Sequence, residues 1–181
     1  VTPALKQYFA EHDVKVILVL TGGPVYLAAS GRSVDRAAFG DRWEGFVRAA
    51  ANYFGESVDV WQIGSDINSN RGLSQFLNPL SPKDSLAPDP AFYTKILHAA
   101  YQVLKDVDPT SQVWLGSLTS VAANNCAMNP LNFLLEVNAA KGWKYMDAIA
   151  YHPVRGALAP ESALPGSSKS ACSSNLMEKP A

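Results

Sequence analysis

The segment that decides the fold runs from residue 60 to residue 68 and reads Val60-Trp61-Gln62-Ile63-Gly64-Ser65-Asp66-Ile67-Asn68. Its first residues are mostly apolar, and a glycine then separates them from side chains that carry hydroxyl, carboxyl and amide groups. This order is typical of a buried strand that stops at a turn. We therefore expect a strand over Val58–Gly64 and a long polar loop over residues 65–89. A loop of that length in a compact domain is usually functional or mobile.

Strand and helix patterns alternate on both sides of this segment. Short, apolar stretches predict three more strands, and apolar residues at helical spacing predict helices between them. The alternation predicts crossover connections and a parallel sheet, hence an α/β fold. The further strands are expected over Val14–Leu20, Val113–Leu118 and Met146–Tyr151, and the helices over Pro3–His12, Val34–Phe54, Pro90–Asp106 and Pro130–Lys141.

Length and charge exclude several classes of function. The chain has 181 residues, with 15 basic and 16 acidic side chains and a formal net charge of -1. This balance gives no electrostatic reason to expect nucleic acid or an anionic membrane as a partner. The longest apolar run, Val14–Leu20, is far shorter than the roughly 20 residues that span a bilayer. No signal peptide is visible, and a first residue of Val1 indicates a processed form or an excerpt of a longer protein.

The strand order alone leaves two folds open, a doubly wound open sheet and part of a closed barrel. A dinucleotide-binding sheet would need a glycine fingerprint after its first strand. The residues Thr21-Gly22-Gly23-Pro24 do not provide one, because the spacing is wrong and Pro24 lacks the backbone N–H that a phosphate would use.

Residues 60–68 resemble the W-E-I-G-N-E-P-N signature at the fourth strand of the retaining glycoside hydrolases whose catalytic domain is a (β/α)8 barrel. Residues Asp147–Pro153 resemble the sixth strand of that family, and Val113–Ser117 lie where the fifth strand belongs. The resemblance implies a partial (β/α)8 TIM barrel over residues 1–155 that contains about strands three to six. A complete barrel takes about 250 residues. The remaining residues, 156–181, are expected to form a loop or an irregular tail.

The resemblance implies roles for residues that match the family's motifs. Asp66 takes the position of the general acid/base, although the family has Glu there, and Ser65 replaces the Asn that precedes it. Ser65, Asn68, His152 and Tyr26 are the expected substrate-binding residues. Aspartate is one methylene shorter, which retracts its carboxyl group by roughly 1.5 Å. A misplacement of about 1 Å can lower the rate about 100-fold.

The second carboxylate of a retaining hydrolase, its nucleophile, lies about 5 to 5.5 Å from the first. In the family it follows the seventh strand, beyond the matched residues. Glu161 and Glu178 are the acidic residues downstream of the match, and neither follows an apolar strand. The sequence therefore predicts that this chain lacks the nucleophile.

Each assignment has a structural alternative. Asp66 is equally compatible with binding backbone amides after a strand, and His152 with an ordinary histidine at a strand end. Trp61 and Trp114 are expected in the core rather than as sugar platforms, and Trp43 and Trp143 are also expected to pack inside the protein. Tyr26, in the loop after the first strand, is the better candidate for an exposed aromatic contact.

Cysteine and histidine positions bear on location and on metals. Cys126 and Cys172 are expected in loops at one face of the barrel, and a disulfide between them would indicate an extracytoplasmic or secreted protein. Two unpaired buried thiols are the alternative. The three histidines lie on different elements and no zinc-like spacing occurs, so neither a metal nor another cofactor is expected.

Two functions remain in competition at this point. The first is a glycoside hydrolase-like protein that is degenerate or incomplete as given, with Asp66 as its acid/base. The second is a structural or carbohydrate-binding subunit derived from the barrel, without hydrolysis. In either case a half barrel leaves open sheet edges and an apolar strand face. The remainder of the barrel or another protein chain is therefore the expected partner, together with carbohydrate.

Overall fold

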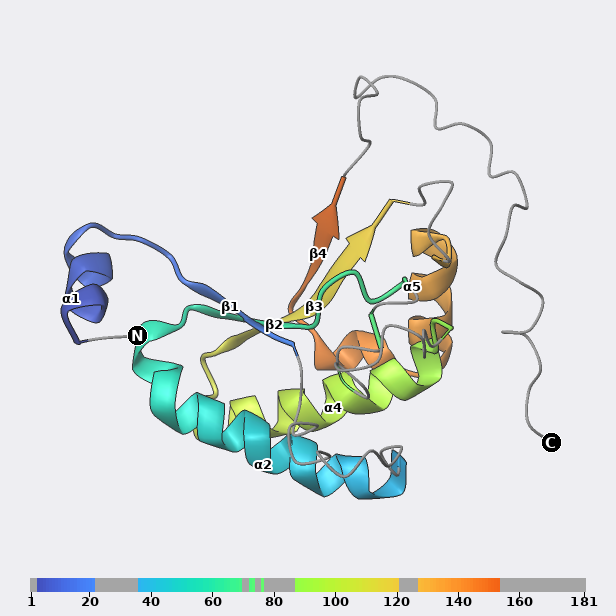
Figure 1. Ribbon diagram of the computed structural model, residues 1–181, viewed down its shortest axis with the longest axis horizontal. Coiled ribbons are helices and arrows are strands. Elements are labelled where there is room, and N and C mark those ends of the chain that lie inside the picture. The colour runs from blue at the N-terminus through green and yellow to red at the C-terminus, as the bar shows by residue number, and fades with distance from the viewer. Residues whose placement is uncertain are drawn as a thin grey trace, which may run out of the picture.

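The computed structural model describes residues 3–21, 36–69, 72–73, 76, 87–120 and 127–153. Within these ranges the chain forms four strands and four α-helices that alternate after the first helix (Figure 1). The helices are α1 (Pro3–Glu11), α2 (Arg36–Phe54), α4 (Pro90–Val107) and α5 (Pro130–Ala139). The strands are β1 (Ile17–Leu20), β2 (Val60–Ile63), β3 (Gln112–Thr119) and β4 (Ala148–His152). Two short 3-10 helices complete the described elements, η2 (Gly55–Ser57) and η3 (Gly142–Tyr145).

The strands form one parallel sheet in the order β1-β2-β3-β4, so each strand lies beside its neighbour in sequence. Residue 17 pairs with 60 and residue 60 with 112, and the register is regular across the first three strands. The pairing of β3 with β4 is interrupted between Leu115 and Leu118. This irregularity redirects the end of β3, as bulges commonly do near functional sites.

The helices α2, α4 and α5 lie along one side of the sheet, whereas α1 stands apart beyond β1 (Figure 1). The core lies between the sheet and these helices, and its largest fully buried side chains include Trp43, Trp61, Tyr93 and Phe76. The early part of the loop after β2 belongs to this core, because Ile67, Leu73 and Phe76 are all fully buried. Those positions are therefore fixed by packing rather than left as a loose polar loop.

Local sequence explains where the helices begin. Asp89 caps α4, its carboxylate accepting a hydrogen bond from the Phe92 N–H, and Pro90 occupies the first turn. Asn129 caps α5 in the same way through the Leu131 N–H, with Pro130 next to it. Each arrangement satisfies an otherwise free amide and uses proline where its missing donor costs nothing.

The predicted alternation of strands and helices is confirmed, and the differences lie at the strand ends. The expected strand over Val14–Leu20 begins at Ile17, because the Val16 N–H binds the Asp59 side chain instead of a neighbouring strand. The strand expected over Val58–Gly64 covers Val60–Ile63, and the one ending at Tyr151 continues to His152. The last extension places His152 itself on β4.

Apolar side chains are exposed at both edges of the sheet. The exposed fraction is at least 39% for each of four apolar residues at these edges, Ile17 and Val19 on β1 and Ile149 and Tyr151 on β4. The central strand β2 contrasts with them, since each of its residues is buried. The expected exposed apolar face of a half barrel is therefore present in the described residues.

Candidate functional site

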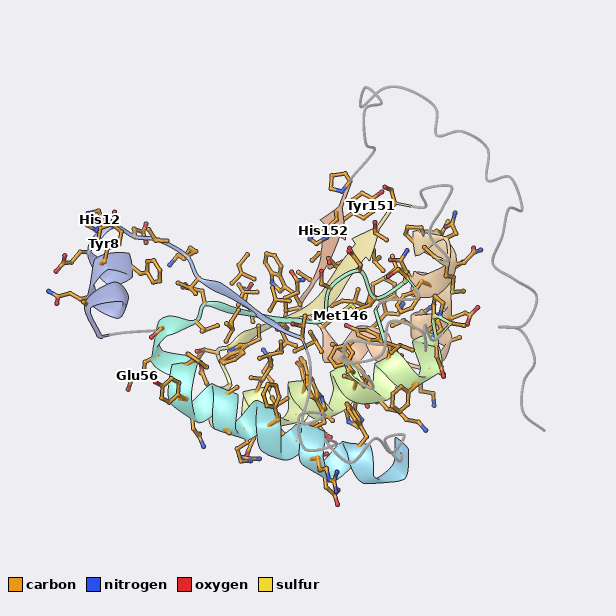
Figure 2. The ribbon with its side chains drawn as sticks, in the orientation of Figure 1. Tyr8, His12, Glu56, Met146, Tyr151 and His152 are labelled. Carbon is orange, nitrogen blue, oxygen red and sulfur yellow. The ribbon has the colours of Figure 1, made fainter. Side chains whose placement is uncertain are left out.

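Asp66 and His152 meet at the edge where the carboxyl ends of the parallel strands come together. Asp66 follows the end of β2, and His152 is the last residue of β4 (Figure 2). The His152 Nδ1 atom lies 3.0 Å from the Asp66 Oδ1 atom, although the two residues are 86 positions apart. The side chains are 46% and 42% exposed, so solvent or a ligand can reach both. Catalytic and binding groups of α/β barrels gather at this edge.

Ser117 fixes the backbone beneath the pair. Its hydroxyl accepts a hydrogen bond from the Asp66 N–H at 2.9 Å and lies 3.2 Å from the Ser65 hydroxyl. Its carbonyl accepts a further bond from the Ile67 N–H at 3.0 Å. Ser117 is fully buried and belongs to the irregular part of β3. Asp66 has a φ of 49°, a left-handed conformation that aspartate tolerates better than most residues.

Tyr93 of α4 supports the same region from the core. Its hydroxyl donates to the Ile63 carbonyl at 2.7 Å and accepts from the Gly116 N–H at 2.9 Å, which ties β2 to β3. Burial raises the pKa of the Tyr93 hydroxyl far above its ordinary value, so the group stays a donor at all working pH values. Gly116 has no room for a side chain, because a Cβ atom there would lie 2.2 Å from the Ile63 carbonyl oxygen.

Asn68 binds backbone groups instead of projecting into the site. Its amide nitrogen donates to the carbonyls of Thr119 and Met128, at 2.9 and 2.8 Å, and its carbonyl oxygen accepts from the Thr119 N–H at 2.8 Å. The residue is fully buried. These contacts join the loop after β2 to the end of β3 and to the segment before α5. They give the Asn68 side chain a structural role, and the expected substrate contact at Asn68 stays a prediction.

The other sequence-based assignments fall into three groups. Ser65 is partly buried beside Asp66, as expected for a residue of the same site. Five of the residues singled out in the sequence lie outside the described residues: Tyr26, Cys126, Glu161, Cys172 and Glu178. The prediction of packed tryptophans is confirmed for Trp43 and Trp61 and wrong for Trp143, which is 43% exposed on η3. Trp114, also expected in the core, is only partly buried.

Sequence reasoning missed Ser117 and Tyr93 as parts of this site. Tyr93 was visible only as one apolar position of a helical stripe, and Ser117 as one residue of a strand. Neither carries a local signal, since their partners at the end of β2 are 30 and 51 residues away. A glycine followed by a serine, Gly116-Ser117, interrupts the apolar strand pattern, and glycine within a strand often marks an irregularity.

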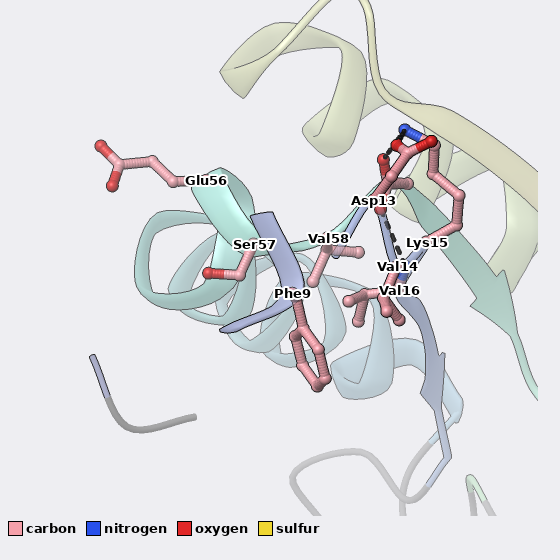
Figure 3. A pocket seen from close by; sticks show the side chains of 9 residues that line it. Phe9, Asp13, Val14, Lys15, Val16, Glu56, Ser57 and Val58 are labelled. Atoms are coloured by element: carbon pink, nitrogen blue, oxygen red, sulfur yellow. Dashed lines mark hydrogen bonds and ion pairs between the residues drawn. The ribbon is translucent and has the colours of Figure 1, made fainter. Parts of the chain in front are cut away.

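A second group of charged residues lies at the amino ends of the strands. Before β1 and β2, Lys15 lies 3.4 Å from Asp59 and 3.7 Å from Asp13, and the Asp59 carboxylate accepts from the Val16 N–H. The Val16 hydrogen bond, followed by the bond to Lys15, holds the pKa of Asp59 below its ordinary value. The same residues line a shallow polar pocket next to α1, together with Phe9, Val14 and the segment 56–58 (Figure 3).

No group of three or more His, Cys, Asp or Glu side chains in the described part of the chain is arranged to hold a metal ion. None of the described helices combines the length and the apolar character that crossing a bilayer requires.

Comparison with known proteins supports the fold. No known protein family matches this chain, and no curated protein matches it in sequence. Among solved structures, it is similar to the Ignisphaera aggregans GH53 catalytic domain, with a TM-score of 0.54 and 19% sequence identity. The similarity covers 82% of this chain and 41% of that one, so this chain spans less than half the length of its structural neighbour. The predicted partial α/β barrel is therefore confirmed, and the fold is similar to that of a glycoside hydrolase.

Proposed function

We propose that this chain is a glycoside hydrolase-like protein that binds carbohydrate at the carboxyl ends of its strands and, taken alone, does not hydrolyse it. The contact between Asp66 and His152 carries this proposal. It brings a carboxylate and an imidazole, both partly exposed, to the edge of the sheet where ligands of barrel proteins bind. Such groups provide the hydrogen bonds that orient a sugar hydroxyl.

The absence of turnover follows from the carboxylates at this edge. Retaining hydrolysis needs two carboxyl groups about 5 to 5.5 Å apart. In the sequence, the three residues that follow each strand include one carboxylate, Asp66 after β2. The corresponding residues are Thr21-Gly22-Gly23 after β1, Ser120-Val121-Ala122 after β3 and Pro153-Val154-Arg155 after β4. The carboxylate of Asp66 is moreover engaged by His152, and its side chain is shorter than that of the glutamate in the family pattern.

Hydrolysis is the second candidate, and the exposure of Asp66 favours it. A side chain that is 42% exposed can meet a glycosidic oxygen if further strands supply a nucleophile. We propose the remainder of the barrel, or another protein chain, as the source of those strands, since both sheet edges expose apolar side chains. The extracytoplasmic location stays a proposal that rests on pairing of Cys126 with Cys172.

One titration separates binding from hydrolysis. The 15N-labelled chain would be titrated with soluble tetrasaccharides of glucose, galactose, mannose and xylose, while new reducing ends are measured in the same tubes. We expect saturable shifts of the Asp66 and His152 resonances for one sugar, and no new reducing ends. Release of reducing ends would replace the proposal by hydrolysis. If none of the four sugars shifts either residue, carbohydrate binding at this edge is refuted.

The matched controls are Asp66→Ala and Asp59→Ala. Both remove one partly exposed aspartate, but they lie at opposite edges of the sheet. Asp66→Ala should abolish the shifts, whereas Asp59→Ala should leave the affinity unchanged. Equal loss in both variants would show that the effect comes from folding rather than from the site.

A further inference from the structure

We propose that Ser117 is a positioning residue of the candidate site: its hydroxyl fixes the backbone of Asp66 so that the carboxylate meets His152 and determines which imidazole nitrogen faces a ligand. The inference rests on the proposed function only where a ligand is concerned. The positioning itself is a property of the free protein and is tested without any sugar.

The first step is the backbone of Asp66. Three consecutive residues of the turn bind Ser117: Ser65 through its hydroxyl at 3.2 Å, Asp66 through its N–H at 2.9 Å and Ile67 through its N–H at 3.0 Å. Only the first two of these bonds use the Ser117 side chain. The left-handed residue of the turn, Asp66 with a φ of 49°, is therefore bonded through its backbone to a buried hydroxyl.

The second step is the hydroxyl's own position. Ser117 lies where the pairing of β3 with β4 is interrupted, between Leu115 and Leu118. A regular strand would alternate its side chains between the two faces of the sheet. The preceding residue, Gly116, is held against β2 by the Tyr93 hydroxyl and has no space for a side chain. The irregular strand end is therefore anchored from the core, and the hydroxyl of Ser117 is presented to the turn that carries Asp66.

The third step is the imidazole. Because the Asp66 carboxylate lies 3.0 Å from Nδ1 of His152, a neutral ring keeps its proton on Nδ1 and donates it to Asp66. Nε2 then carries a lone pair, and within the described part of the chain no residue hydrogen-bonds to it. His152 therefore offers an acceptor for a ligand hydroxyl, and Asp66 acts on the ligand through the ring that it orients.

The test reads the protonated nitrogen directly. Long-range 1H–15N spectra of the labelled chain report, for each ring, which nitrogen carries the proton. His152→Gln identifies the signals of His152. We expect the Nδ1–H form to dominate at His152 in the unmodified chain. Ser117→Ala should convert it largely to the Nε2–H form, as should Asp66→Ala, while His12 and His98 stay unchanged.

Ser111→Ala is the control for a merely structural effect. Ser111 is a buried serine just before β3, and its hydroxyl donates to Asp108 at 2.9 Å, so its removal also costs one hydrogen bond. It should leave the tautomer of His152 unchanged. In Ser117→Ala the Asp66 amide should also exchange about ten times faster, as loss of one hydrogen bond implies. The Ile67 amide, bonded to the Ser117 carbonyl, should keep its exchange rate.

Each outcome decides the proposal. The proposal is overturned if the tautomer of His152 is unchanged in Ser117→Ala. It is also overturned if His152 of the unmodified chain is in the Nε2–H form, a result that does not depend on the folding of any variant. If Ser117→Ala is unfolded, Ser117→Cys keeps the shape with a weaker acceptor and should give an intermediate tautomer ratio. For a sugar that binds, Ser117→Ala should weaken affinity about tenfold more than Ser111→Ala, and equal affinities would overturn the link to the ligand. If no sugar binds, the proposed function fails while the tautomer result stands.

Discussion

Carboxylates have different roles at the amino ends and at the carboxyl ends of the strands. At the amino ends of the strands, Asp59 and Asp147 each accept a hydrogen bond from a backbone N–H, of Val16 and Val113, and each lies near a lysine. At the carboxyl ends, neutral groups hold the backbone, and the carboxylate of Asp66 is left to bind His152. Charge that stabilises the fold is therefore found at one edge, and charge available to a ligand at the other.

This contrast agrees with a general property of α/β barrels. Residues at the amino-terminal face contribute mainly to stability, whereas those at the carboxyl-terminal face carry function. Here the division depends on Ser117, Asn68 and Tyr93, whose neutral hydrogen bonds replace the carboxylates that cap backbone groups elsewhere. The following variants test whether the two edges differ as described, beginning with the largest expected effect on stability.

Gly116→Ala should destabilise the protein by more than about 3 kcal/mol, because the new methyl group would lie 2.2 Å from the Ile63 carbonyl oxygen and push β2 away from β3. Urea unfolding followed by circular dichroism measures the effect. Gly45→Ala is the control, since a Cβ atom there meets nothing within 4 Å on α2. It should stabilise the chain by about 0.5–1 kcal/mol. Similar values for both variants would show that the carboxyl edge is not tightly anchored.

Asn68→Ala should lower the free energy of unfolding by about 1–3 kcal/mol, because it leaves partly buried backbone groups of Thr119 and Met128 without their partner. Chemical denaturation is again the measurement. Asn138→Ala removes an exposed asparagine from α5 and should change stability by less than about 0.5 kcal/mol. A small effect at Asn68 would favour its assignment as a ligand contact.

Asp59→Ala should lower the free energy of unfolding more than Asp66→Asn does. Loss of Asp59 removes the partner of the Val16 N–H and of Lys15, and should cost about 1 kcal/mol once its partial exposure is considered. Asp66→Asn removes the charge but keeps a residue that tolerates the left-handed backbone. It should change stability by less than about 0.5 kcal/mol, since among the described residues the carboxylate bonds to another partly exposed side chain, His152. Thermal unfolding at pH 7 compares them. The reverse ranking would contradict the division between the two edges.

The smallest effect is the pH dependence of the Asp59 contribution. Its pKa is lower in the folded chain than the value of about 3.9 for unfolded aspartate. The stabilisation is therefore fully present above about pH 4 and disappears as the pH falls through the folded pKa. The stability difference between the unmodified chain and Asp59→Ala should be constant from about pH 5 to about pH 7, which is roughly one to three units above the unfolded pKa. It should shrink at lower pH; a difference that grows with acid would exclude this cause.

The sequence predicted the order of strands and helices well, because each element carries its own local pattern. Helix starts at Pro90 and Pro130 are confirmed, since proline and the preceding cap are adjacent in sequence. Strand ends were less accurate: the start of β1 depends on Asp59, 43 residues from Val16. Trp143 was expected to be buried from its residue type alone, but η3 places it at the surface.

The sequence singled out Asp66 and His152 of the candidate site, but not the residues that support them. Asp66 and His152 were singled out because the family pattern marks them, and the contact between them connects residues on strands that are not neighbours in the sheet. The structural contacts of Asn68 were not predicted, because its three bonds go to residues 51 and 60 positions away. Such contacts become apparent only when β2, β3 and the segment before α5 are placed side by side.

The left-handed backbone of Asp66 has a consequence for any attempt to restore the glutamate of the family pattern. Left-handed conformations cost most residues about 1–2 kcal/mol, and aspartate is among the few that adopt them readily. A single Asp66→Glu exchange would therefore lengthen the acid and strain the turn at the same time. A glutamate at this position therefore requires the turn over Ser117 to change as well, so the residue and the shape of its turn constrain each other.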